Sequence, residues 1–156
     1  MLQSGENYMD NSAKNTESGF FTMKGYAEHK TGLTASMEDY LEMIYRLSKN
    51  GGVIRVSELA ACLHVRPPSA SKMSAILKDA GFVSFQKYGY LSPTDKGKNV
   101  GAYLLHRHDT IHRFLCILNG SKSELEQAEK IEHYLDARTV ENLARLTEKM
   151  QNDSER

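Results

Sequence analysis

The chain has 156 residues, 40% of them hydrophobic, which suits one domain or two small ones with a real core. Its only cysteines, Cys62 and Cys116, are too far apart for a CxxC metal knuckle, and they form no framework typical of secreted proteins. No basic and apolar signal opens the sequence, and no apolar run approaches the roughly 20 residues of a membrane span. We therefore expect a cytoplasmic protein that is neither exported nor embedded in a membrane.

The formal net charge of zero conceals an uneven distribution of charge. Residues 66–107 contain seven Lys or Arg against two acids, a net charge of +5, whereas residues 124–156 contain nine acids against five bases, a net charge of −4. This asymmetry indicates one part that faces an anion such as nucleic acid and another that faces cations. The alternative is two solvated helical faces without a partner.

Residues 1–33 are polar and aperiodic, so we expect a disordered leader there. Apolar residues then recur with helical spacing at Met37, Tyr40, Leu41, Ile44 and Leu47. They predict a helix that Ser36 caps and that Gly51 and Gly52 end.

The next segment predicts two short helices joined by a tight turn, which is a helix-turn-helix. The first helix would be capped by Ser57, and the second would open at Pro68 after the break at "VRP". Residues 82–94 then alternate between apolar and polar, with "KYGY" as a hairpin tip. This order is that of a winged helix.

Residues 94–150 predict only helices, at about 94–118, 123–135 and 139–150, and residues 151–156 form a tail. The predicted fold is therefore mainly α with a small β-hairpin wing. An N-terminal winged helix-turn-helix domain (34–93) precedes a C-terminal helical domain (94–150).

Small polar and basic side chains cluster at the start of the second helix of the motif, in the turn before it and at the hairpin tip. Such side chains let a helix approach a DNA groove and contact bases or phosphates. For each one alone, a solvated surface position is the alternative. The candidates for DNA contact are Arg66, Ser69, Ala70, Ser71, Lys72, Lys87 and Tyr88.

Acids and histidines gather on three predicted helices. Glu132 falls on an apolar stripe, where a buried carboxylate costs several kcal/mol unless a cation compensates it. Oxygen-dominated ligation with some imidazole suits a divalent ion such as Mn²⁺. His112 is a second choice for His108, and surface acids or a core histidine are the alternatives for single members. The candidate metal ligands are Asp39, Glu42, His108, Glu129, Glu132 and His133.

Five motifs in order resemble the diphtheria toxin repressor family, most closely its manganese-responsive branch, the manganese transport regulators: "SMEDYLEMIYRL", "RVSELAACLHVRPPSASKM", "LSPTDKGK", "RHDTIHRFL" and "EKIEHYL". The resemblance implies a metal-activated homodimeric repressor whose winged helix binds operator DNA and whose C-terminal helices dimerise. It places the metal ligands on the same six residues and prefers His108 to His112. Iron-type relatives carry a thioether and a thiol in place of Glu42 and Glu129, so the resemblance favours manganese.

We therefore interpret the chain as a cytoplasmic Mn(II) sensor, not an enzyme, that represses manganese uptake genes. Its expected partners are double-stranded operator DNA and a second copy of itself, with no membrane and no small organic substrate. One alternative is a winged-helix regulator that responds to Fe, Zn or an organic effector. A di-metal carboxylate enzyme is the other, although it would normally supply Glu-x-x-His motifs from two helices.

Overall fold

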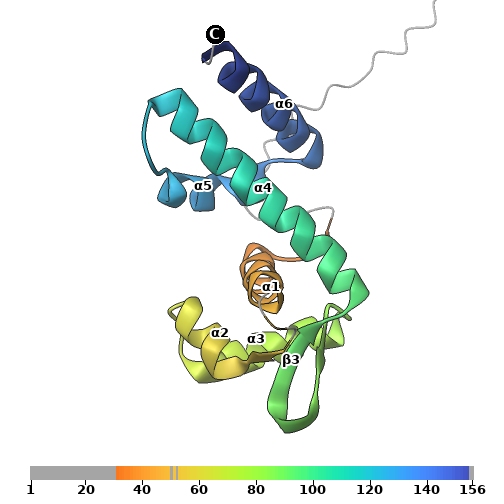
Figure 1. Ribbon diagram of the computed structural model, residues 1–156. Helices are drawn as coiled ribbons and strands as arrows, with labels where there is room; N and C mark the ends of the chain where they lie inside the picture. The colour runs from red at the N-terminus through yellow and green to blue at the C-terminus, as the bar shows by residue number, and fades with distance from the viewer. Residues whose placement is uncertain (1–30, 50, 52, 155–156) are drawn as a thin grey trace, which may run out of the picture.

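The computed structural model describes residues 31–49, 51 and 53–154, so residues 1–30 of the expected leader lie outside the described residues. Figure 1 shows α1 between the helix-turn-helix below it and the long α4 above it. The elements in chain order are α1 (Ala35–Ser48), β1 (Ile54–Arg55), α2 (Val56–Cys62), α3 (Pro67–Asp79), β2 (Val83–Phe85), the 3₁₀ turn η2 (Lys87–Gly89), β3 (Tyr90–Pro93), α4 (Asp95–Asn119), α5 (Leu125–Ile131), the 3₁₀ turn η3 (Glu132–Tyr134) and α6 (Ala137–Ser154).

The first helix starts two residues earlier than the sequence predicts. Thr34 has extended backbone angles and its side chain accepts a hydrogen bond from the Met37 amide, so Thr34 and not Ser36 is the N-cap. The helix ends at Ser48, before Gly51 is reached. Leu33, assigned to the leader from the sequence, is buried in the core that α1 shares with the winged helix.

The helix-turn-helix and the wing are present as predicted, with small differences at the helix starts. α2 begins at Val56 after Arg55, so Ser57 is not its cap, and α3 begins at Pro67 rather than Pro68. β2 and β3 form the antiparallel hairpin, with Ser84 opposite Ser92. The two-residue strand β1, which is too short to produce a sequence pattern, adds to β3 and completes a three-stranded sheet.

The long helix α4 connects the winged helix to the C-terminal helices. Thr94 caps its start by accepting a hydrogen bond from the Gly97 amide, and Gly120 ends it at a φ of 61°. A Cβ on Gly101 would lie 2.6 Å from the Cβ of Tyr45, so only glycine permits the observed approach of α1 to α4. This close contact between α1 and α4 is what brings the acidic face of α1 beside His108.

The predicted single helix at 123–135 is in fact two elements. Regular α-helix ends at Ile131, and residues 132–134 continue as the 3₁₀ turn η3, which alters the directions of the side chains that follow. α5 packs on α4 through Ala128, Ile111 and Leu115, and α6 runs along α4.

The structure confirms the predicted fold class of a winged helix-turn-helix followed by a helical domain. Within residues 31–154, apart from the two positions left undescribed, none of the helices combines the length and apolar character that crossing a membrane requires.

Candidate metal centre and nucleic-acid interface

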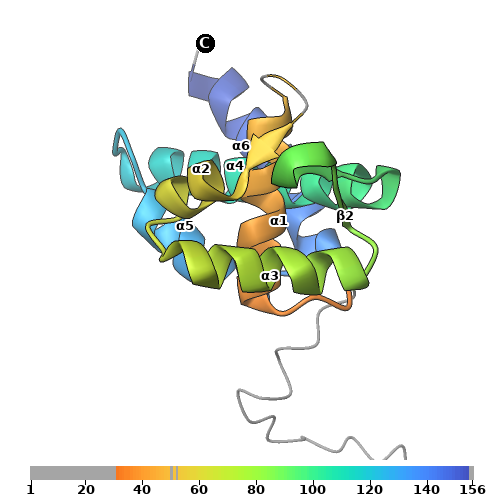
Figure 2. The same ribbon diagram turned by 90° about the horizontal axis from the view of Figure 1, so that it is seen from below.

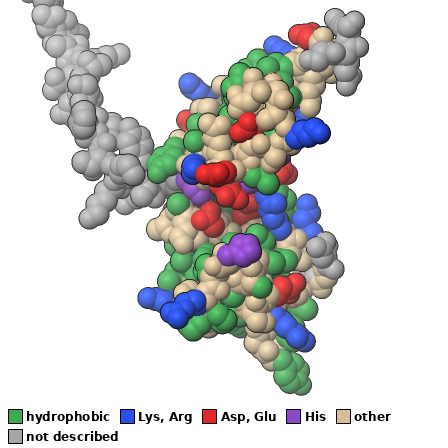
Figure 3. Space-filling view, turned by 90° about the vertical axis from the view of Figure 1, so that its left-hand side faces the viewer, with side chains coloured by type: hydrophobic (Ala, Val, Ile, Leu, Met, Phe, Trp, Pro, Cys, Tyr) green, Lys and Arg blue, Asp and Glu red, His purple; other side chains and the backbone are tan. Residues whose placement is uncertain are grey.

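The predicted metal ligands converge on one pocket of about 450 Å³, formed between α1, α4 and the α5–η3 segment. Figure 3 shows acidic side chains gathered where the winged helix meets the C-terminal helices. Residues far apart in the sequence thus share one site. The candidates that line it are Asp39, Glu42, His108, Glu129, Glu132 and His133.

Glu42, His108 and Glu132 form the first group of potential ligands, and all three are buried. Each offers one ligand atom, and these atoms all lie within 4.8 Å of one another. The Nδ1 atom of His108 lies 2.8 Å from Oε2 of Glu132. On the other side, Arg46 donates two hydrogen bonds to Oε1 of Glu42.

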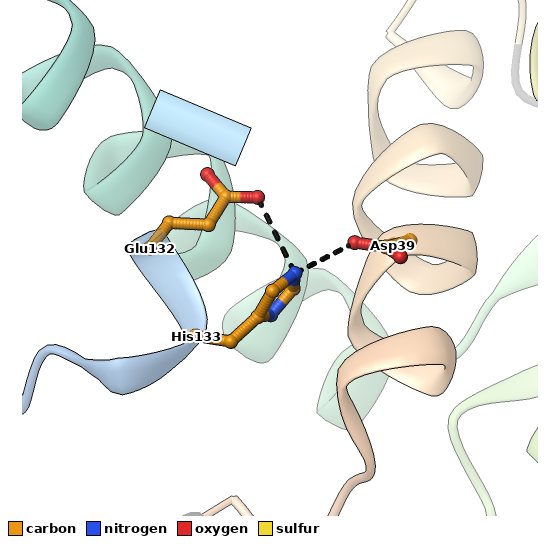
Figure 4. A group of neighbouring side chains, drawn as sticks. All are labelled: Asp39, Glu132 and His133. Carbon is orange, nitrogen blue, oxygen red and sulfur yellow. Dashed lines mark ion pairs between the residues drawn. The ribbon is translucent and has the colours of Figure 1, made fainter. Parts of the chain in front are cut away.

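Asp39, Glu132 and His133 form the second group. The Nε2 atom of His133 lies 3.0 Å from Oδ1 of Asp39 and 3.8 Å from Oε1 of Glu132. Figure 4 shows the imidazole of His133 between the two carboxylates, one from α1 and the other from η3. Glu132 therefore belongs to both groups and presents a different oxygen to each histidine.

Glu129, a predicted ligand, and His112, the second choice for His108, belong to neither group. Glu129 lines the pocket but is exposed and is a member of neither group. Its predicted spacing to Glu132 assumed one continuous helix, whereas the winding changes between them. His112 is in neither group either; its ring stacks on His108, and its Nε2 lies 3.5 Å from Sγ of Cys116.

The surrounding charges shift the pKa values of three of these side chains. Burial alone would lower the pKa of His133, but hydrogen bonds with Asp39 and Glu38 and the nearby acidic charges raise it to about 9. The hydrogen bond with Glu132 raises the pKa of His108 above its usual value. Burial, and then the charge of Glu132, raises the pKa of Glu42. All three shifts are upward, so the surroundings of these side chains favour the more positively charged form of each.

Behind this pocket lies a buried ion pair that the sequence analysis did not identify. Arg107, 2% exposed, donates a hydrogen bond of 2.7 Å to Oε2 of Glu38, which is 1% exposed. The same oxygen lies 2.8 Å from Nδ1 of His133. Because the Glu38 carboxylate contacts Nδ1 of His133, the other ring nitrogen, Nε2, faces Asp39 and Glu132. Arg107 falls on the apolar stripe between Leu104 and Ile111, and that signal could have revealed it.

The donor set fits a hard or borderline divalent cation. The two groups together offer three carboxylates from Asp39, Glu42 and Glu132, and two imidazoles. Carboxylate and imidazole donors without a thiolate suit Mn²⁺ and similar ions better than soft ones.

The predicted DNA-contacting residues lie at the start of α3 and at the tip of the wing. Arg66, Ser69, Ser71 and Lys72 are exposed at or near the first turn of α3, a helix that Figure 2 shows across the face seen from below. Ala70 differs: it is completely buried in the core, so its side chain cannot face a groove.

The tip of the wing, η2, carries the remaining candidates. Lys87 is exposed, and Tyr88 is 94% exposed. A basic and an aromatic side chain at such a tip are free to contact DNA beside the groove that α3 would enter.

Both halves of the chain match known domain families. Residues 32–91 match the family described as "Iron dependent repressor, N-terminal DNA binding domain", and residues 94–156 match "Iron dependent repressor, metal binding and dimerisation domain". The chain is 36% identical over 124 residues to the HTH-type transcriptional regulator MntR of Bacillus velezensis and, equally, to that of Bacillus subtilis. These alignments cover 79% of this chain and 87% of each relative.

Solved structures of metal-dependent regulators are also similar. The manganese regulator SloR superposes with a TM-score of 0.63 at 29% identity, over 70% of this chain and 52% of its own. The metal-dependent transcriptional regulator MtsR gives a TM-score of 0.66 at 28% identity, over 74% of this chain and 55% of MtsR. ScaR with bound Zn²⁺ gives a TM-score of 0.60 at 30% identity, over 72% of this chain and 53% of ScaR. The chain thus spans about half the length of these three proteins.

Proposed function

Because the chain belongs to the diphtheria toxin repressor family, we propose that it is a metal-sensing repressor that responds to Mn²⁺ and controls manganese uptake genes. The matched domains of this family bear the general description iron dependent repressor. Members of this family are metal-dependent DNA-binding transcriptional repressors, and this chain is a transcriptional regulator rather than an enzyme. The identity of the ion, the ligands and the regulated genes are the proposed part.

The observation that carries the proposal is the position of Glu132. It is 3% exposed, yet it belongs to both ligand groups, so its carboxylate lies where a cation would be shared or bridged. A buried carboxylate in such a place requires compensation by positive charge. The proposed ligands are Asp39, Glu42, His108, Glu132 and His133, with Glu129 completing the set from the pocket wall.

The proposed ligands come from three elements that the fold packs together. Asp39 and Glu42 belong to α1, which contacts both α3 and the wing, whereas His108 belongs to α4 and Glu132 to η3. A bound divalent ion would supply the positive charge that lets these carboxylates remain ionised side by side. The ligands would then hold α1 against α4 and favour one placement of the winged helix, so metal binding and DNA binding would be linked.

Manganese is the ion that the donor set favours. Both groups consist of carboxylates and imidazoles, the donors that suit Mn²⁺, and Cys62, which lines the same pocket together with Met43, is a member of neither group. The relatives support the same choice, because SloR is named a manganese regulator and ScaR a manganese-activated repressor.

The proposed partners are double-stranded operator DNA and a second copy of the chain, in the cytoplasm. A two-fold dimer through the dimerisation domain would present two α3 helices to a pseudo-palindromic operator. The proposed contacts on each half-site are Arg66, Ser69, Ser71, Lys72, Lys87 and Tyr88.

Direct metal binding tests the proposal. Calorimetric titration of dialysed protein with Mn²⁺ should show saturable binding, and Glu132→Ala should abolish most of it because both groups lose a member. Glu141→Ala is the matched control, since Glu141 is an exposed acid paired with His106 outside the pocket. Equal Mn²⁺ binding by the parent and Glu132→Ala would refute the proposed site.

A further inference from the structure

We propose that Arg46 is a built-in competitor of the metal: its guanidinium holds Glu42 in the metal-free protein and must leave that carboxylate when the ion binds. This inference rests on the proposed function, and it concerns a residue outside the ligand set. It makes Arg46 a determinant of how tightly the group that contains Glu42 holds the ion.

The geometry places Arg46 at the pocket rather than on an ordinary helix surface. Arg46 lines the same pocket as the ligands. Its Nε and Nη2 atoms lie 2.9 Å and 2.6 Å from Oε1 of Glu42, so the guanidinium donates two hydrogen bonds to one oxygen. The Glu42 side chain is only 11% exposed, and the Arg46 side chain is 37% exposed. The cation can therefore move toward solvent, whereas the carboxylate cannot.

A comparison within this chain shows why the pair is not a routine surface contact. Lys130 and Glu126 are also four residues apart and 2.5 Å from each other, but their side chains are 68% and 84% exposed, where such pairs contribute little. Glu42 instead shares a buried cluster with His108 and Glu132. A counter-charge beside a desolvated carboxylate interacts more strongly, because the effective dielectric constant is lower there.

Arg46 should therefore weaken metal binding at one of the two ligand groups. An ion at Glu42, His108 and Glu132 must displace the hydrogen bonds of Arg46 and approach its positive charge. The contacts that join His133 to Asp39 and Glu132 do not involve Arg46. Removing the charge of Arg46 should therefore tighten binding at the group that contains Glu42.

Calorimetric Mn²⁺ titration of Arg46→Met tests this inference. Methionine keeps much of the length of the side chain but removes its charge and donors. We expect the binding step that uses Glu42 to tighten about tenfold, because a nearby and partly solvent-screened unit charge no longer repels the ion. Arg46→Lys, which keeps the charge, should stay close to the parent. Arg113→Met is the matched control, because Arg113 is exposed and contacts Gln151, away from the pocket.

Separate outcomes distinguish the two proposals. If the parent binds Mn²⁺ and loses it on Glu132→Ala, but Arg46→Met binds with the affinities of the parent or more weakly, the role of Arg46 is refuted and the metal site stands. If the parent itself binds no Mn²⁺, both fail. Arg46→Gln gives the same comparison should the methionine variant fold poorly.

Discussion

Replacing Glu38 by Gln should destabilise the metal-free protein severely. The change keeps the size of the side chain but removes the charge that neutralises Arg107, whose exposure is 2%. It also removes the anionic partner of Nδ1 of His133. Leaving one member of a buried ion pair without its counter-charge costs about 3–5 kcal/mol. Because the amide oxygen of Gln can still accept one hydrogen bond from Arg107, we expect about 3 kcal/mol.

Urea unfolding of the metal-free protein measures this loss. Parent and variant are compared at one protein concentration, since the stability of a dimer depends on concentration. Glu126→Gln is the matched control: it removes a similarly short ion pair that is exposed, and its midpoint should hardly move. A loss below about 1 kcal/mol for Glu38→Gln would refute the argument that this pair is a buried, mutually dependent one.

Four further results are expected. The pKa of His133 is raised to about 9 from 6.5, so its contribution to metal-free stability should be complete below pH 6.5 and lost as the pH rises through about 9. Mn²⁺ binding should accordingly release protons near neutral pH, and identical calorimetric enthalpies in buffers of different ionisation enthalpy would contradict this. Gly101→Ala should lower stability by about 1–3 kcal/mol because its Cβ meets Tyr45, and an unchanged thermal midpoint would show that α1 and α4 can separate freely. Lys72→Ala should weaken DNA binding and reduce the slope of its salt dependence without altering Mn²⁺ affinity; an unchanged slope would remove Lys72 from the phosphate contacts.

The sequence predicted the fold well because its local signals agree with the tertiary structure. Apolar spacing identified the helices, and the alternation before Pro93 identified the hairpin. The errors lie at helix starts, where Thr34 and Ser36 both suit an N-cap and only the backbone angles distinguish them. β1 was not predicted because a strand of two residues is too short to show an alternating pattern of apolar and polar side chains.

The sequence predicted which residues line the candidate metal centre, but not how they are arranged in it. A buried position on an apolar stripe singled out Glu132 and His108, and the structure brings both to one pocket. Helical spacing could not show that the winding changes at Glu132, nor that Glu129 lies outside both groups while still lining the pocket. The apolar stripe of α4 marks Arg107 as a buried charge, but its pairing with Glu38 joins residues 69 positions apart, a contact that only tertiary packing creates.

Metal-dependent DNA binding by the parent and by Glu132→Ala tests the central claim most directly. Duplexes are first enriched from random-sequence DNA by the Mn²⁺-loaded parent protein, and their retention is then measured with and without Mn²⁺. The account predicts that the parent retains the enriched duplexes strongly only when Mn²⁺ is present, and that Glu132→Ala gains nothing from the ion. DNA binding by the parent that is equally strong without metal, or a full Mn²⁺ response in Glu132→Ala, would contradict it.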